Sequence, residues 1–192
     1  MSDPVDPARH MSELMKLTAF MKNDTRFVAA DRPAGPDPID VYRTVVSALT
    51  NEKVSFLLHG GWAMLAYGYE RATHDLDFIV PVEAEVCRTV YQIMKEAGGQ
   101  VGTVDGPNAE AAIENRCERL NFEFGGWRVD LFRDPTFNHL AGRAIEIELG
   151  GRQIRVINPH DLRRKKLARG THKDRIDVEW LLQRFGEEGN PP

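Results

Sequence analysis

Residues 56–80 read FLLHGGWAMLAYGYERATHDLDFIV and form the most informative pattern of the chain. The nearly continuous apolar run at about 54–58 predicts a strand buried on both faces, and therefore a central strand. Gly60-Gly61 then predicts a turn into a short helix, and residues 76–80 predict a second strand. A strand, a helix and a second strand in this order are typical of the beginning of an α/β domain.

The segments on either side extend this beginning into a mixed sheet. Apolar residues at helical spacing predict helices at about 39–49 and 82–97. Alternating apolar residues around Gly125-Gly126 and Gly150-Gly151 predict two antiparallel hairpins. Because hairpins follow the α/β beginning, we predict an α/β (α+β) fold with a mixed sheet, and not a doubly wound one.

Three segments are expected along the chain. Residues 1–36 are expected to hold an N-terminal helix and a proline-rich arm, residues 37–157 the main domain, and residues 158–186 a C-terminal helical extension. The amphipathic helix at about 11–21 is either a strap on the domain or a docking helix for another chain. The last helix is expected to bury a stripe made of Ile176, Trp180, Leu181 and Phe185.

The composition excludes several classes of protein. The 192 residues carry a net charge of -4, so the chain has no general attraction for nucleic acid, and such contact needs a local basic patch. Its two cysteines, Cys87 and Cys117, lack the spacing of metal ligands and are expected to be reduced thiols. No apolar run approaches the roughly 20 residues of a membrane span. We therefore expect a cytoplasmic protein that does not contact a membrane.

A pair of carboxylates in the second strand is the first candidate site. Asp75 and Asp77 are two residues apart, so their side chains leave the same face of a strand and lie close together. Two like charges at this separation are unfavourable unless a cation lies between them. Mg²⁺ is the expected cation, because it prefers oxygen ligands and is usually held by one or two carboxylates together with phosphates.

The double glycine gives this pair a chemical context. Gly60 and Gly61 follow a buried strand and open a helix, which brings backbone N–H groups and the positive end of the helix to one place. A phosphate-binding turn beside a metal-binding pair predicts a site for a nucleoside triphosphate and its metal. The alternative is a sterically tight helix start beside an acidic pair that is only structural.

Asp130 is the third candidate ligand. It lies between Val129 and Leu131 in a predicted strand, and it therefore faces away from the side that these two residues bury. Taken alone, it could be an ordinary exposed strand residue. Placed beside Asp75 and Asp77, it would complete a two-metal site in which one metal lowers the pKa of an acceptor hydroxyl.

These residues resemble the DNA polymerase β type nucleotidyltransferase superfamily. The resemblance rests on Gly60-Gly61, on Asp75-Leu76-Asp77-Phe78 thirteen residues later, and on Asp130 in an apolar strand. Further motifs resemble the minimal nucleotidyltransferases of the AbiEii type, which are toxins of type IV toxin-antitoxin systems. These motifs are Arg71-x-Thr73-x-Asp75-x-Asp77, Asn158-Pro159-His160-Asp161-Leu162, Lys166 and Lys173-Asp174-x-x-Asp177.

The resemblance implies transfer of a nucleotidyl group from a nucleoside triphosphate, with Mg²⁺ and with loss of pyrophosphate. It implies that Asp75, Asp77 and Asp130 are the catalytic and metal-binding residues. It also implies nucleotide contacts for a set made of Gly60, Gly61, Arg71 and Lys166. At the second glycine position the family often has serine, so Gly61 offers only its backbone.

The acceptor is the least defined part of this hypothesis. Nine basic residues against two acidic ones between Arg152 and Arg175 favour RNA, such as tRNA, and hence a toxin-like enzyme with a possible antitoxin partner. The first alternative is an adenylyltransferase for a small hydroxylated drug, because the glycine and aspartate motifs are also similar to the lincosamide nucleotidyltransferases. The second alternative is a catalytically silent fold that acts as a binding module.

The position of Lys166 depends on the helix face that it shares with Leu162. If Leu162 faces the core, Lys166 is expected at the edge of the cleft, and the alternative is a lysine on the surface.

Overall fold

The computed structural model describes residues 35–69, 73, 75–102 and 118–187. It contains a seven-stranded sheet in the order β3-β4-β5-β2-β1-β7-β6. The strands are β1 (Leu57–His59), β2 (Asp75–Val80), β3 (Gln100–Val101), β4 (Arg119–Phe124), β5 (Trp127–Arg133), β6 (Ile145–Leu149) and β7 (Arg152–Val156). The pairs β2–β5 and β1–β7 are parallel and the other pairs are antiparallel, which confirms the predicted mixed sheet.

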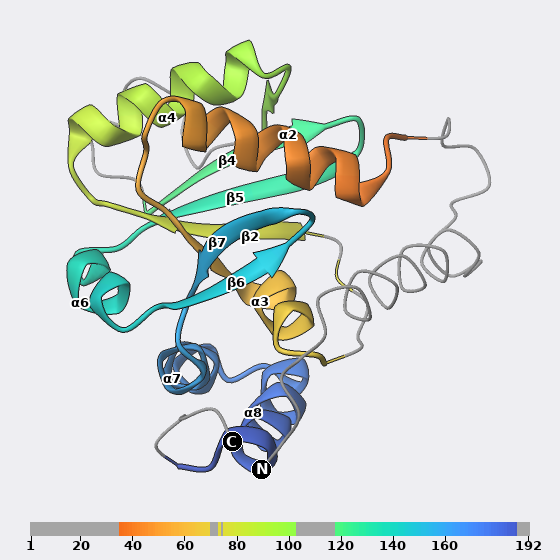
Figure 1. Cartoon of the computed structure of the whole chain (residues 1–192), viewed down its shortest axis with the longest axis vertical. Coiled ribbons are helices and arrows are strands. Elements are labelled where there is room, and N and C mark those ends of the chain that lie inside the picture. The colour runs from red at the N-terminus through yellow and green to blue at the C-terminus, as the bar shows by residue number, and fades with distance from the viewer. Residues whose placement is uncertain (1–34, 70–72, 74, 103–117, 188–192) are drawn as a thin grey trace.

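Helices cover the sheet on both sides. They are α2 (Pro38–Asn51), α3 (Gly60–Ala66), α4 (Ala84–Glu96), α6 (Phe137–Gly142), α7 (Pro159–Arg169) and α8 (His172–Phe185). In the view of Figure 1, α2 and α4 lie above the sheet, and α3, α7 and α8 lie below it. In the part of the chain that the structure describes, no helix has the length and apolar character needed to cross a membrane.

Local sequence signals explain where several helices begin. The side chain of Asp37 accepts a hydrogen bond from the backbone N–H of Ile39 at 3.0 Å and caps α2. Asn158 caps α7 in the same way, and Pro159 takes the first helical position, where its missing N–H is not needed. Thr171 and Asp174 form a reciprocal capping box at the start of α8.

Buried apolar residues of β2 lie on both faces of the sheet, and the carboxylates share their face with Ile79. Alternation along β2 sends Leu76, Phe78 and Val80 to one face, and Asp75 and Asp77 to the other. The three apolar side chains are essentially buried. Burial of this apolar set fixes the register of β2, because a slip by one residue would move the aspartates into the core.

The structure corrects part of the prediction for the C-terminal helix. Ile176 was expected in the buried stripe of α8, but 46% of it is exposed. Asp174 and Asp177 are buried instead, together with Val178 and Leu181. The predicted stripe counted apolar residues alone, whereas these two carboxylates are buried with basic partners.

Other expectations fall outside the described residues or were incomplete. The predicted helix at 11–21, most of the proline-rich arm and Cys117 lie outside the part that the structure describes. Cys87 is buried in α4. The sequence did not predict β3 or α6, which span two and six residues.

Candidate metal centre and nucleotide site

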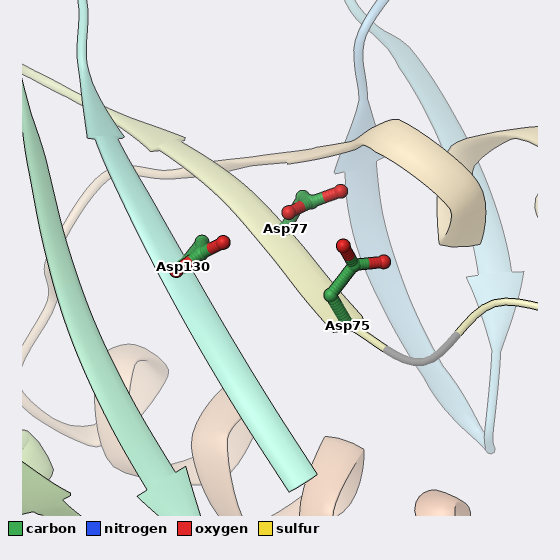
Figure 2. Close-up of side chains that lie close together, drawn as sticks. All are labelled: Asp75, Asp77 and Asp130. Atoms are coloured by element: carbon green, nitrogen blue, oxygen red, sulfur yellow. The ribbon is translucent and has the colours of Figure 1, made fainter. Parts of the chain in front are cut away.

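Three carboxylates from two neighbouring strands meet on one face of the sheet. Asp77 of β2 and Asp130 of β5 are direct partners in the parallel pairing, and Asp75 lies two residues before Asp77. One carboxylate oxygen from each residue lies within 4.8 Å of the other two. Figure 2 shows the three side chains gathered over these strands. The parallel register thus brings together residues more than fifty positions apart in the sequence.

Neighbouring side chains hold two of these carboxylates in place. The hydroxyl of Thr73 donates a hydrogen bond of 2.9 Å to Oδ1 of Asp75. The side-chain amide of Asn121 donates to Oδ1 of Asp130 from the adjacent strand β4. Arg128 of β5 contacts both aspartates, with Nη2 at 3.0 Å from Oδ2 of Asp75 and Nε at 3.1 Å from Oδ2 of Asp130.

Burial and like charge give the aspartates different acidities. Burial, and then the negative charges of Asp75 and Asp130, raise the pKa of Asp77 to about 7. Burial alone would raise the pKa of Asp75 as well, but the hydrogen bond from Thr73 and the charge of Arg128 outweigh it and lower the pKa. The cluster therefore holds more negative charge than it can carry without a cation.

The donor set fits a hard divalent metal ion. All three groups offer oxygen atoms, two of them are largely buried, and they converge within the distance that one or two bridging cations require. No other group of three such ligands was found among the described residues. Asp75, Asp77 and Asp130 are therefore the residues that would hold the metal.

Metal affinity is expected to depend on pH through Asp77. The raised pKa means that this carboxyl keeps its proton up to about pH 7 in the metal-free protein, so a metal must displace that proton at lower pH. The apparent affinity for Mn²⁺ should fall about tenfold per pH unit below pH 7 and level off above it. Calorimetric titrations from pH 5.5 to 8.5 would measure this slope. A flat profile would contradict the assignment of Asp77 as a ligand.

Gly60 adjoins the carboxylate cluster directly. It begins α3 with φ of +63°, a backbone conformation that favours glycine. A Cβ atom at this position would lie 1.8 Å from Oδ2 of Asp77. The sequence predicted a turn with bare backbone N–H groups at Gly60 and Gly61, and both residues are buried there. The close approach to Asp77 is a second requirement for glycine that the sequence did not indicate.

Replacing Gly60 by alanine is expected to displace the carboxylate of Asp77. A misplacement of about 1 Å costs roughly a hundredfold in rate, so the rate of the reaction at this site should fall by about that factor. Gly151→Ala is the matched control, because Gly151 also has positive φ, +82°, but no atom lies within 4 Å of its added Cβ. Steady-state rates and melting temperatures of both variants would test this. Equal losses of activity would mean that backbone strain, and not contact with Asp77, explains the effect.

Two of the expected nucleotide-binding residues need separate comment. Arg71 lies outside the described residues, so its assignment stays a prediction. Lys166 is only 2% exposed, so the alternative of a surface lysine is wrong, and the expected position at the cleft edge stays a prediction. Its ammonium lies 2.6 Å from Asp177 and 3.8 Å from Asp174. The ion pairs with α8 explain its burial, and a contact with triphosphate through this atom stays an untested prediction.

Sequence reasoning missed three cations beside the cluster: Arg128, Arg169 and Arg119, whose Nη1 lies 3.5 Å from Oδ2 of Asp130. Arg128 lies two residues before Asp130 on the same strand, so the alternation that placed Asp130 on the site face also places Arg128 there. Arg169 lies at the end of α7, and Asp174 holds its guanidinium with contacts of 2.8 and 2.5 Å. The positive charge of Arg169 opposes the rise in the pKa of Asp77. For Arg169 the linear sequence held no corresponding signal.

Internal contacts occupy much of the basic C-terminal region. Of the nine basic residues that favoured RNA, five bind other parts of the protein. Arg155 donates to the carbonyl of Ala141, Arg163 to those of Gly186 and Glu187, Lys165 to Asp134, Lys166 to Asp177, and Arg169 to Asp174. This region therefore offers fewer free cations to a polyanion than the sequence indicated.

Comparison with solved structures places the fold among nucleotidyltransferases. The antibiotic-resistance factor ANT(2'')-Ia superposes with a TM-score of 0.59 at 16% identity, covering 79% of this chain and 85% of that one. TM1012 from Thermotoga maritima, a candidate nucleotidyltransferase, gives a TM-score of 0.55 at 19% identity, covering 82% and 100%. The lincosamide adenylyltransferase LnuA with bound lincomycin gives 0.52 at 16% identity, covering 76% and 95%.

A comparison with curated proteins found no match for this sequence.

A match to a family model establishes the family of this chain. The model of the aminoglycoside-2''-adenylyltransferases matches residues 41–181, which include the whole carboxylate cluster, Gly60, α7 and most of α8. Nucleotidyltransferases of this kind use divalent metals, in agreement with the acidic donor set. The chain belongs to the aminoglycoside-2''-adenylyltransferase family, and it is a nucleotidyltransferase.

Proposed function

We propose that the protein transfers a nucleotidyl group from a nucleoside triphosphate, bound with Mg²⁺, to a hydroxyl of a small hydroxylated molecule of the antibiotic type. The observation that carries this proposal is the cluster of Asp75, Asp77 and Asp130 inside the region matched by the family model. A small-molecule acceptor is supported by that family and by the antibiotic substrates named for two of the similar structures.

The reaction joins the acceptor oxygen to the α-phosphorus as the bond to pyrophosphate breaks. Bound Mg²⁺ would neutralise the triphosphate and lower the pKa of the acceptor hydroxyl. Asp75 and Asp77 would hold and orient the metal from β2. Asp130 would hold it from β5 and help to activate the acceptor hydroxyl. Gly60 keeps the turn before α3 against Asp77, which fixes where the phosphates can approach.

RNA as the acceptor is the less supported proposal. It was expected from the basic residues between Arg152 and Arg175, but five of these nine bind within the protein. An AbiEii-like toxin with an antitoxin partner depends on that acceptor. We also propose, independently of the acceptor, an N-terminal arm at 1–36, a nucleotidyltransferase domain at 37–157 and a helical extension at 158–186. In this division α7 and α8 would support the site through Arg169, which Asp174 holds and whose charge acts on Asp77.

The test offers the alternative acceptors separately. Purified protein would receive Mg²⁺ and each α-labelled nucleoside triphosphate with tobramycin, with lincomycin or with total RNA. We expect label on a small-molecule acceptor, release of pyrophosphate and loss of both in Asp130→Asn. Label on RNA alone would replace the proposal by the toxin-like function. Folded protein that yields neither labelled acceptor nor pyrophosphate would favour the silent binding module.

A further inference from the structure

Arg128 occupies the place of a counter-ion within the carboxylate cluster. It is the direct register partner of Asp75 across the β2–β5 pair, and it precedes Asp130 by two residues on its own strand. Its guanidinium lies 3.0 Å from Oδ2 of Asp75 and 3.1 Å from Oδ2 of Asp130. One side chain thus bridges two of the three carboxylates drawn in Figure 2, and these belong to different strands.

This bridge uses the same groups that would hold a metal. A guanidinium is charged at all ordinary pH values and offers several donors in a fixed plane, so it can neutralise two carboxylates at once. A divalent cation needs the oxygen atoms of the same residues. Arg128 and a metal ion are therefore competitors for Asp75 and Asp130.

The side chain of Arg128 can move away from the cluster more easily than the side chain of Asp130 can. The side chain of Arg128 is 52% exposed, whereas that of Asp130 is 1% exposed. Water can therefore solvate the guanidinium when a metal takes its place at the carboxylates. Glu123 of β4 lies opposite Arg128 in the antiparallel pairing and is exposed. Cross-strand partners lie side by side on one face, so Glu123 offers the released guanidinium another carboxylate.

We propose that Arg128 is an exchangeable counter-ion: it bridges Asp75 and Asp130 in the metal-free protein, yields them to the metal, and then binds the incoming triphosphate. The inference rests on the proposed function, because it requires the metal to bind at these carboxylates. Arg128 starts beside the metal ligands, so after release it stays within reach of phosphate oxygens bound to that metal.

The proposal predicts effects of opposite sign from one substitution. Arg128→Gln should bind Mn²⁺ alone about tenfold more tightly, because the competing cation is gone, and should raise the KM for the nucleoside triphosphate about tenfold. A general structural defect would weaken both. Arg88→Gln is the matched control: Arg88 is a 53% exposed arginine in an ion pair with Glu85, on the far helix α4.

Arg128→Lys separates direct competition from the general effect of charge. Lysine keeps the positive charge but cannot bridge two carboxylates through a planar fork. We expect Arg128→Lys to bind Mn²⁺ more tightly than the wild type. Wild-type affinity in Arg128→Lys, with tighter binding in Arg128→Gln, would mean that only long-range charge acts, and would overturn the exchange.

Thermal unfolding gives a readout that is independent of activity. In EDTA, Arg128→Gln should melt a few degrees below the wild type, because Asp75 and Asp130 lose the guanidinium that bridges them, and saturating Mn²⁺ should remove the difference. Unchanged Mn²⁺ affinity in Arg128→Gln, with binding abolished in Asp75→Asn, would overturn this inference and leave the proposed metal site intact. Absence of Mn²⁺ binding in the folded wild type and every variant would overturn both.

Discussion

Asparagine in place of Asp77 is expected to lower kcat by about a thousandfold or more while the protein stays folded. A thousandfold corresponds to about 4 kcal/mol of transition-state stabilisation, which is within the range that metal-held charge supplies. Asp77 is buried between Asp75 and Asp130, and asparagine matches its shape without its charge. The metal-free variant should be at least as stable as the wild type, because repulsion within the cluster is reduced.

Single-turnover rates at saturating Mg²⁺ and nucleotide would measure this loss. Glu148→Gln is a suitable control, because it neutralises an exposed strand carboxylate on β6, at the far edge of the sheet. Circular dichroism would establish that both variants fold. Retention of more than a tenth of the activity in folded Asp77→Asn would rule out Asp77 as an essential metal ligand.

Methionine in place of Lys166 is expected to destabilise the protein by about 3–5 kcal/mol, because it removes the ammonium paired with the buried carboxylate of Asp177. Lys166 lies 2.6 Å from Asp177, and both side chains are at most 3% exposed. Asp174 keeps Arg169 as a partner, so the main loss falls on Asp177. Urea unfolding of both proteins would measure the difference.

The double variant Lys166→Met with Asp177→Leu isolates the ion pair. Removing both charges should recover a large part of the loss, since a buried pair replaced by apolar residues is often close to neutral. Lys95→Met, on the exposed side of α4, should change stability by less than about 0.5 kcal/mol. If the single variant is as stable as the wild type, the buried pair contributes nothing to the α7–α8 contact.

Strand alternation explains why the carboxylate cluster could be predicted. Asp75, Asp77 and Asp130 were each assigned to one face by a two-residue period, and the structure brings them together. The same rule would have found Arg128, two residues before Asp130. The predicted superfamily is supported by the family model, whereas the AbiEii type stays a prediction.

Depth of burial could not be predicted in the same way. Helical periodicity placed Lys166 and Leu162 on one face of α7, but periodicity does not show what covers that face. Asp174 and Asp177 were named as part of a motif, but their burial was not predicted, because carboxylates are usually exposed and this burial depends on cations from another helix. The six residues of α6 are too few to give a periodic signal.

The parallel pairing of β2 with β5 also has a consequence for biosynthesis. Asp77 leaves the ribosome 53 residues before its register partner Asp130, with α4, β3 and β4 between them. Contacts this distant along the chain form only after the intervening loop closes. A nascent chain that ends before β5 therefore carries Asp75 and Asp77 without their third ligand, and the enzyme stays inert until most of its sequence has been synthesised.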